Sequence, residues 1–450
     1  MVRVTDMTHG RPIRLILLFS LPLMLGSVFQ QLYTIVDTII IGRGVGMQAL
    51  ASIGAADWIN WLVLWGLQGF TQGFAILAAQ EFGAGAYDRL RRVLAMIVKL
   101  SCWFGIAVTI ISLLLVRPLL TLLHTDPAVF GGAQTYLYVQ FGGSLIIIAY
   151  NMAAAVLRCL GDSRTPLFAI IAASFANIAL DLLFVMGFGW GIFGASFATV
   201  LAQLIAFLLC LRSLRRLPFV QLTKADWKTD PAILLHLCRL GIPTGLQMSM
   251  ITLGGMVLQS VLNGFGVVFV AGYTAANKLY GILESASVAF GYAMTAYMGQ
   301  NRGARNAARI DAGIRAVLVL SAEFTAAIVT AMLLAGKPLL GLFLSTEEAG
   351  AADALAVAYQ YLMVLMAFLF ALFMLQAYRS SLQGLGEMTV PTLSGFAEML
   401  MRMGAALVLP TFIGQSGVFF AEGAAWVCAA ALNLVWYYMR IGKIKRDMLQ

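Results

Sequence analysis

Charge is scarce in this sequence. Only 11% of its 450 residues are Asp, Glu, Lys or Arg, against roughly 25% in soluble domains. Hydrophobic residues make up 61% of the chain, and the mean hydropathy is +0.89. This composition excludes a soluble globular protein. It predicts an all-α polytopic membrane protein, in which most residues face lipid or pack between spans.

Histidine, cysteine and nucleotide-binding motifs are also scarce. The three histidines lie far apart in the sequence, and no CxxC pair, P-loop or nucleophile–base motif is present. These absences disfavour a metalloenzyme, an intramembrane enzyme and an ATP-driven pump. We therefore expect no enzymatic activity, no cofactor and no metal beyond a possible Na⁺. The five cysteines are interpreted as packing residues: Cys102, Cys159, Cys210, Cys238 and Cys428.

Long apolar runs follow one another through the whole chain. Each is close to the roughly 20 residues that a helix needs to cross a bilayer. They predict twelve transmembrane helices, near 15–41, 58–80, 93–116, 134–157, 166–187, 194–211, 241–262, 275–298, 312–335, 357–378, 391–410 and 421–439.

The basic residues are distributed unevenly over this topology. With the N-terminus in the cytoplasm, 24 of the 29 Lys and Arg residues fall at the cytoplasmic side. By the positive-inside rule this bias predicts a multi-pass protein of the cell membrane with both termini cytoplasmic. The excess of positive charge is thus topological, and we expect no nucleic-acid partner.

The sequence repeats itself at an offset of about 220. Residues 44–57 align with 264–277 at five of fourteen positions, and Pro22 aligns with Pro243. The repeat predicts two pseudo-symmetric six-helix lobes, 1–211 and 241–450, joined by a cytoplasmic interfacial linker, 212–240. Duplicated halves related by an axis along the membrane normal are typical of transporters.

Ionisable and polar residues inside the first-lobe spans are candidates for ion coupling. Asp37 lies in the first span, while Asn177 and Asp181 share one face of the fifth because they are four residues apart. Thr199 lies in the sixth span. These oxygen ligands suit Na⁺ or a shared proton, and a carboxylate in a membrane must find a partner. The alternative is that Asn177 and Asp181 only join neighbouring helices through hydrogen bonds.

Several further polar residues are weaker candidates. Tyr136, Tyr150 and Asn151 of the fourth span are candidate cavity residues, with plain packing as the alternative. In the second lobe Glu284 and Lys278, with Glu323, either neutralise one another or face a cavity for a cationic substrate.

One pair in the second lobe receives a structural interpretation. Glu398 and Arg402 replace Asn177 and Asp181 at the repeat offset of 221. Because they are four residues apart and opposite in charge, they predict a salt bridge inside the eleventh span.

Proline introduces a possible conformational element. Pro22 removes one helix hydrogen bond from the first span, about four turns before Asp37. A bend there could respond to ion binding at Asp37. The alternative is that Pro22 and Pro243 are inherited packing features.

Several segments together resemble the multidrug and toxic compound extrusion (MATE) family of secondary transporters over nearly the whole length. The matching segments are LPLMLGSVFQQLYTIVDTIIIGRGVGMQALAS, AAQEFGAGAYDRLRR, VLRCLGDSRTP, FANIALDLLF, GIPTGLQ, MGQNRGARNAAR and SLQGLGEMTVP.

The resemblance implies a V-shaped pair of lobes working by alternating access. It also implies export of amphipathic or cationic drugs in exchange for H⁺ or Na⁺, by a protein we expect to be a monomer. The family's first-lobe cation site falls on Asp37, Asn177, Asp181 and Thr199. The seventh and tenth spans here lack the acids of another branch, so the chain resembles the branch that couples ions through its first lobe. The alternative is a lipid-linked saccharide flippase of the same wider superfamily.

Overall fold

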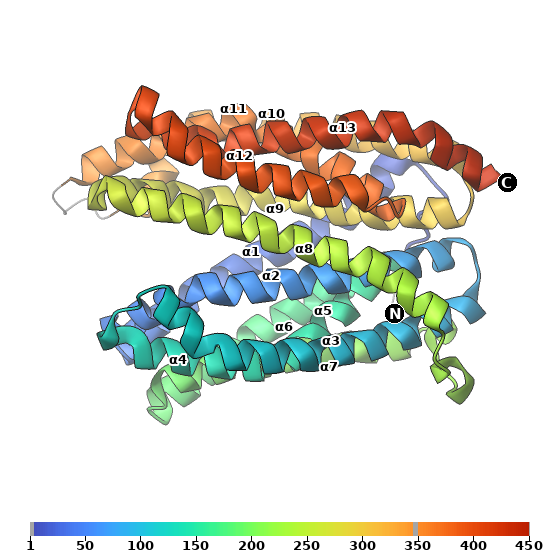
Figure 1. The fold of residues 1–450 in the computed structure, drawn as a ribbon, viewed down its shortest axis with the longest axis horizontal. Helices are drawn as coiled ribbons and strands as arrows, with labels where there is room; N and C mark the ends of the chain where they lie inside the picture. The colour runs from blue at the N-terminus through green and yellow to red at the C-terminus, as the bar shows by residue number, and fades with distance from the viewer. Residues whose placement is uncertain (1–3, 345–349, 450) are drawn as a thin grey trace. The chain divides into compact units, whose positions relative to one another are not determined.

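A computed structural model describes residues 4–344 and 350–449 of the chain, and it is almost entirely helical (Figure 1). The long helices are α1 Pro12–Gly44, α2 Met47–Gly83, α3 Tyr87–Leu122, α4 Pro127–Gly142, α5 Ser144–Cys159, α6 Arg164–Asp181, α7 Gly191–Arg215, α8 Pro231–Leu262, α9 Val267–Gly303, α10 Ala307–Gly341, α11 Ala351–Gly384, α12 Thr389–Ile413 and α13 Phe420–Leu449. Short helical turns follow or join them at η1 Leu182–Gly187, η2 Pro218–Val220, η3 Lys224–Trp227, η4 Asn263–Phe265 and η5 Gln415–Phe419. The all-α polytopic fold is confirmed.

Most of the predicted spans correspond to helices that are long and apolar enough to cross a membrane. Within the described ranges ten helices pass this test, or eleven if the bent pair α4 and α5 forms one span. The predicted span 275–298 falls in α9, which is long enough at 37 residues but is not among them. α9 carries Lys278 and Glu284, and much of its length is buried. A helix covered by its neighbours needs less apolar surface than one that faces lipid.

The fourth span differs from the single straight helix that the apolar run predicts. α4 and α5 meet at Gly143 with a bend of 50°. An added Cβ at Gly143 would lie 2.5 Å from a methyl group of Val200 in α7. The bend therefore forms where the backbone at Gly143 touches the side chain of Val200 in α7. Only glycine leaves room for this contact, because it has no Cβ.

The seventh span begins earlier than its apolar run. Asp230 caps α8 by accepting hydrogen bonds from the N–H groups of Ala232 at 3.0 Å and Ile233 at 3.2 Å, and Pro231 is the first helical residue. Residues 231–240, which the sequence assigned to the interfacial linker, therefore form the first part of the helix of the seventh span, because α8 continues through Pro243 to Leu262.

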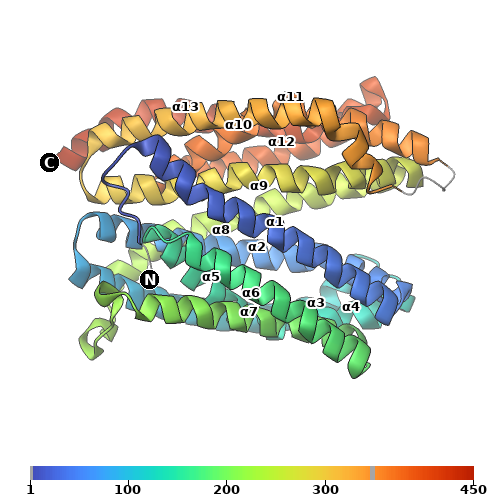
Figure 2. The ribbon, with the colours of Figure 1, turned by 180° about the vertical axis from the view of Figure 1, so that it is seen from behind.

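The described chain divides into two compact units. Unit 1 comprises Met1–Asp6 and Leu21–Gly245, and unit 2 comprises Met7–Ser20 and Leu246–Gln450. Two of the three changes of unit occur inside helices, in α1 next to Pro22 and in α8 two residues after Pro243, and the third lies before α1, between Asp6 and Met7. In unit 1 α5, α6 and α7 pack side by side (Figure 2), and in unit 2 α11 packs against α9, α10 and α13 (Figure 1).

Candidate functional site

Two acids from distant parts of the sequence meet inside unit 1. Asp37 lies on α1 and Asp181 is the last residue of α6. The carboxyl groups of Asp37 and Asp181 approach closely enough for a hydrogen bond to join them when one holds a proton. Asp181 is completely buried. Two carboxylates this close repel each other, so the pair favours binding a proton or a cation.

The polar atoms around this pair lack partners in the part of the chain that the structure describes. They are Oδ1 of Asp37, both carboxyl oxygens of Asp181, and Oδ1 and Nδ2 of Asn177. Asn177 is 1% exposed and lies one turn before Asp181 on α6. A buried polar atom without a hydrogen bond costs several kcal/mol in an apolar medium. This convergence of bare oxygens fits a small cation, a proton or water.

The local fold explains how the acids come together. An apolar cluster packs the end of α1 against α2, α7 and the turn after α6, through Ile40, Ile41, Ala49, Val185 and Ala195. Directly after Asp181 the chain leaves α-helical geometry for one π-helical stretch, η1. Such π turns are rare and occur frequently at functional sites.

Thr199 lies half-buried on α7, which packs against α6. Its hydroxyl donates a hydrogen bond to the carbonyl of Ala195 at 3.2 Å. The oxygen lone pairs of a hydroxyl that donates in this way stay available to a cation. Among the described residues no hydrogen bond joins Thr199 to Asp37 or Asp181, so its ligand role stays a prediction.

A third acid near the pair was missed. Asp57 on α2 lies within electrostatic range of Asp37 and of Tyr136. Tyr136 accepts a hydrogen bond from Nδ2 of Asn60 at 3.2 Å. The second span predicted from the sequence starts at residue 58, one residue after this acid, whereas α2 begins at Met47. An acid at the edge of an apolar run was the available signal.

The other fourth-span candidates, Tyr150 and Asn151, lie on α5. Asn151 donates from Nδ2 to the carbonyl of Ile147 on its own helix at 3.0 Å. Tyr150 is 8% exposed and lies on the same helix, α5. The structure thus places Tyr136 near the acids and gives Asn151 a bond within its own helix.

The predicted second-lobe pair belongs to a larger network within unit 2. Arg402 places Nη2 3.1 Å from Oε1 of Glu398 and 2.8 Å from Oε2 of Glu422. The other oxygen of Glu398 accepts from Arg379 at 2.5 Å. The sequence offered no reason to add Arg379 or Glu422, because they come from α11 and α13. Of the remaining candidates, Lys278 is exposed and Glu284 is half-buried.

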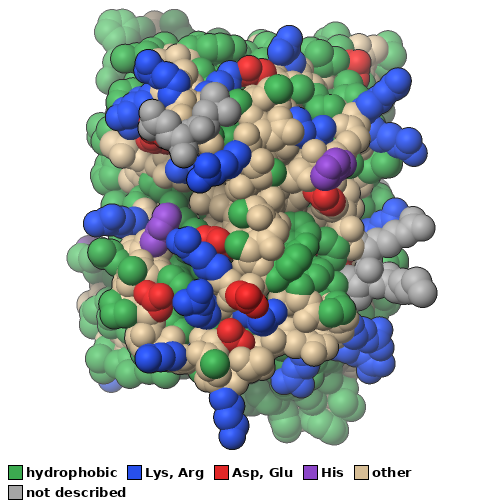
Figure 3. Space-filling model, turned by 90° about the vertical axis from the view of Figure 1, so that its right-hand side faces the viewer, with side chains coloured by type: hydrophobic (Ala, Val, Ile, Leu, Met, Phe, Trp, Pro, Cys, Tyr) green, Lys and Arg blue, Asp and Glu red, His purple; other side chains and the backbone are tan. Residues whose placement is uncertain are grey.

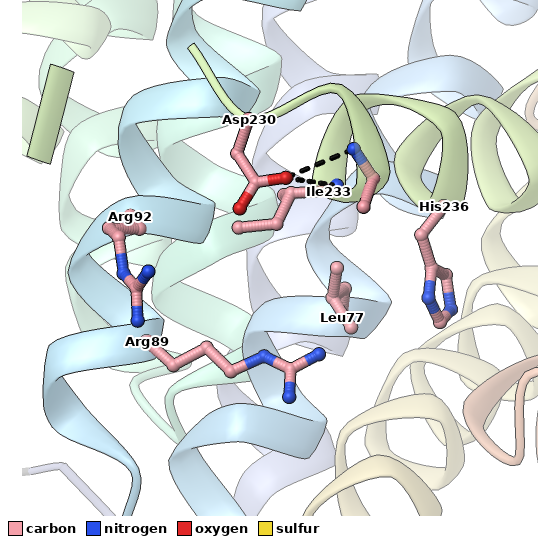
Figure 4. A pocket seen from close by; sticks show the side chains of 7 residues that line it. Leu77, Arg89, Arg92, Asp230, Ile233 and His236 are labelled. Atoms are coloured by element: carbon pink, nitrogen blue, oxygen red, sulfur yellow. Dashed lines mark hydrogen bonds between the residues drawn. The ribbon is translucent and has the colours of Figure 1, made fainter. Parts of the chain in front are cut away.

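A surface cavity of about 330 Å³ lies at another place in unit 1 (Figure 4). Arg89 and Arg92 from α3 and His236 from α8 line it, with Leu77 of α2 at its side. Leu77 and Asp57 are twenty residues apart on one helix, a separation of roughly 30 Å. The cavity is therefore distinct from the acid pair.

Fold and site together define a polytopic helical membrane protein whose spans enclose unpaired carboxyl groups. The model of the MatE family matches residues 22–183 and 243–408, and the two matches start 221 residues apart, as the internal repeat does. The chain belongs to the MATE family.

Named relatives and solved structures agree with this assignment. The chain is 31% identical to the probable multidrug resistance protein YpnP of Bacillus subtilis, covering 99% of this chain and 98% of that protein. It is 26% identical to the probable multidrug resistance protein YoeA of the same organism, covering 95% and 94%. A crystal structure of MATE in complex with MaL6 superposes with a TM-score of 0.91 at 24% identity, over 99% of this chain and 100% of that one.

Proposed function

We propose that this protein is a secondary active multidrug antiporter that exports amphipathic or cationic compounds in exchange for H⁺ or Na⁺. The main observation in support is that buried side-chain oxygens of Asp37, Asn177 and Asp181 have no hydrogen-bond partner among the described residues. A buried site with two carboxyl groups holds one positive charge readily and releases it when the surroundings change. The names of the two Bacillus relatives support the drug-export part of the proposal.

In this mechanism the ion and the drug bind to unit 1 one after the other. A proton or Na⁺ that enters from outside is shared by the carboxyl groups of Asp37 and Asp181, with Asn177 and Thr199 as oxygen donors. The shared positive charge removes the repulsion between the two carboxylates, so α1 packs against α6 and the drug is released. Tyr136 and Asp57 lie next to this region. The H⁺ or Na⁺ is itself transported and drives drug export, and the mechanism uses no cofactor.

The distribution of charge supports the orientation. Many Lys and Arg side chains lie on the face drawn in Figure 3. In Figure 1 the C-terminus of unit 2 lies on the side that Figure 3 shows. Because basic residues of membrane proteins stay in the cytoplasm, we place this side of the protein in the cytoplasm and the spans in the cell membrane. We propose a monomer as the functional unit. Arg402 is already neutralised by Glu398 and Glu422, which disfavours the flippase alternative.

Everted membrane vesicles test the proposal and identify the ion. Uptake of a fluorescent organic cation into the vesicles, which corresponds to export from the cell, is followed while a pH gradient and a sodium gradient are imposed separately. Vesicles without the protein are the control. Transport driven by one of the gradients is expected. Uptake of the dye that ATP drives after both gradients have been collapsed would overturn the proposal.

A further inference from the structure

The surface cavity of unit 1 is surrounded by basic side chains from two helices. Its volume is about 330 Å³, and Arg89 and Arg92 of α3 and His236 of α8 line it. Figure 4 shows these three side chains around one space, with Leu77 of α2 beside them. Guanidinium groups are always positively charged and donate hydrogen bonds in a planar fork that fits phosphate oxygens. The cavity therefore suits a ligand that carries a phosphate group.

The two arginines of the cavity differ in how they are paired. Nε of Arg89 lies 3.0 Å from a carboxyl oxygen of Glu81. Arg91, the sequence neighbour of Arg92, pairs with Asp88 and points its charge to groups outside the cavity lining. Arg92 itself makes no hydrogen bond or ion pair among the residues that the structure describes. Its N–H donors are therefore available to a ligand.

Asp230 adds one negative group to the lining of the cavity. Its Oδ1 accepts hydrogen bonds from the N–H groups of Ala232 at 3.0 Å and Ile233 at 3.2 Å. Its Oδ2 has no hydrogen bond within the described part of the chain. A purely anionic ligand would be repelled by this carboxylate, whereas an ammonium group next to the phosphate would be attracted to it. The lining thus favours a ligand with both charges.

The cavity lies where three predicted spans begin or end. These spans are 58–80, 93–116 and 241–262, and they belong to α2, α3 and α8. Leu77 is near the end of the first span, and Arg92 and His236 come just before the other two. About 20 residues of helix cross the hydrocarbon core of a bilayer, and α8 has 32. The first turns of α8 therefore extend to the depth of the lipid headgroups.

Exposed aromatic residues occur at the same helix ends. Tyr87, the first residue of α3, is 44% exposed, and Trp227, the last residue of η3, is 40% exposed. The ring of Tyr87 lies 5.4 Å from that of Phe219, and Nζ of Lys99 donates to the carbonyl of Trp227 at 2.6 Å. Because Tyr and Trp are enriched at the membrane–water interface, these residues favour a lipid as the source of the phosphate.

We propose that this cavity binds the headgroup of a membrane phospholipid that carries a phosphate and a primary ammonium group, as an ethanolamine headgroup does. Arg89 and Arg92 bind the phosphate oxygens, and Oδ2 of Asp230 accepts a hydrogen bond from the ammonium group. Leu77 and Ile233 supply apolar surface for the first part of the acyl chains. The site rests on the membrane fold and on the lining of the cavity, and it does not depend on the antiport proposal.

Native mass spectrometry of the purified full-length protein tests the phosphate contact. The protein is titrated in detergent with dioleoyl phosphatidylethanolamine. Arg92→Gln should weaken binding about tenfold or more, because it removes a charge-assisted contact. Arg239→Gln is the matched control, since Arg239 is an exposed arginine of α8 that does not line the cavity; it should bind like the wild type. Equal losses in the two variants would overturn the proposal, because overall charge would then explain the binding.

Asp230→Asn tests the ammonium contact. Asparagine caps a helix about as well as aspartate, so this variant keeps the start of α8 and removes only the negative charge. The same titration with dioleoyl phosphatidylglycerol, which has the phosphate but no ammonium group, gives the preference between the two lipids. The wild type should prefer the ethanolamine lipid, and Asp230→Asn should reduce this preference about tenfold. A wild type that prefers phosphatidylglycerol, or an unchanged preference in Asp230→Asn, would overturn the proposal.

Inorganic phosphate distinguishes a lipid from a soluble anion at this cavity. Melting temperatures in detergent are measured for the wild type and Arg92→Gln, alone, with inorganic phosphate and with the ethanolamine lipid. The lipid should stabilise the wild type and not Arg92→Gln, and inorganic phosphate should stabilise neither. Stabilisation by inorganic phosphate that Arg92→Gln abolishes would overturn the lipid assignment. None of these measurements uses transport, so the antiport proposal and this one can fail separately.

Discussion

The carboxyl groups of Asp37 and Asp181 lie within reach of one shared hydrogen bond, although 144 residues separate them in the sequence. The bond requires a proton on one of the two groups. This relationship supports the proposed site for a single positive charge, formed by α1 and α6.

Removing the second acid should damage transport nearly as much as removing the first. Asp181→Asn takes away one contact to a charged ligand, worth about 1.5–3 kcal/mol, which corresponds to a loss of efflux rate on the order of ten- to a hundredfold. Asn177→Ala and Thr199→Ala remove neutral ligands and should cost about tenfold or less. Efflux assays at matched expression check the order, and a milder effect of Asp181→Asn than of Thr199→Ala would contradict it.

The buried network should be a major source of stability in unit 2. Arg402→Ala leaves Glu398 and Glu422 without Arg402, and breaking a buried ion pair costs about 3–5 kcal/mol. The double variant Glu398→Gln/Arg402→Met should recover only part of this loss, because Arg379 and Glu422 then lack an oppositely charged partner.

A surface pair in the same unit provides the control. Arg440 and Glu387 lie 3.2 Å apart and are partly exposed, so Arg440→Ala should cost no more than about 1 kcal/mol. Thermal melting in detergent compares the variants. Equal melting temperatures for Arg402→Ala and Arg440→Ala would show that the network is not structural.

The connection between α7 and α8 should loosen in acid. Burial alone would raise the pKa of Asp226, but hydrogen bonds from the backbone N–H and hydroxyl of Thr223, together with Arg91 and Arg92, lower it below its usual value. The stability from Asp226 is thus complete above an ordinary Asp pKa of roughly 3.9 and is lost as the pH falls through its lowered pKa. The protection factors of residues 223–228 against hydrogen exchange should fall in that range. The Asp226→Asn protein should have low protection factors there already at neutral pH. High protection factors that do not change with pH in both proteins would contradict this expectation.

The two prolines at the changes of unit should differ in function. On the coupled interpretation Pro22 lets α1 bend in response to an ion at Asp37, so Pro22→Ala should slow efflux strongly. Pro243 in α8 has no acid in its own helix, and Pro243→Ala should affect mainly stability. A spin-label pair across Pro22 should report a distance change with pH or Na⁺ that Asp37→Asn abolishes. If Pro22→Ala and Pro243→Ala had equal, small effects on efflux, and the spin-label distance did not change, α1 would be a rigid support.

Much of the fold was predictable because a bilayer imposes long apolar runs, and because the i and i+4 spacing of Asn177 and Asp181 fixes a shared face. The bend at Gly143 and the π turn after Asp181 were not predictable, since both follow from contacts with other helices. Asp57 was missed for the same reason, as an apolar window cannot tell where a helix begins beyond its apolar part. The partners of Glu398 and Arg402 on other helices, Arg379 and Glu422, can be identified only from the tertiary structure.

The ion-coupling role of Asp37 is tested most directly in proteoliposomes. Purified wild-type protein and Asp37→Asn are reconstituted at equal amounts, and drug movement is measured under the gradient that drives the wild type, with melting temperature as the folding control. We expect a folded Asp37→Asn protein that no longer moves drug against its gradient, because an amide neither releases a proton nor balances Na⁺. Wild-type transport by Asp37→Asn would contradict the account.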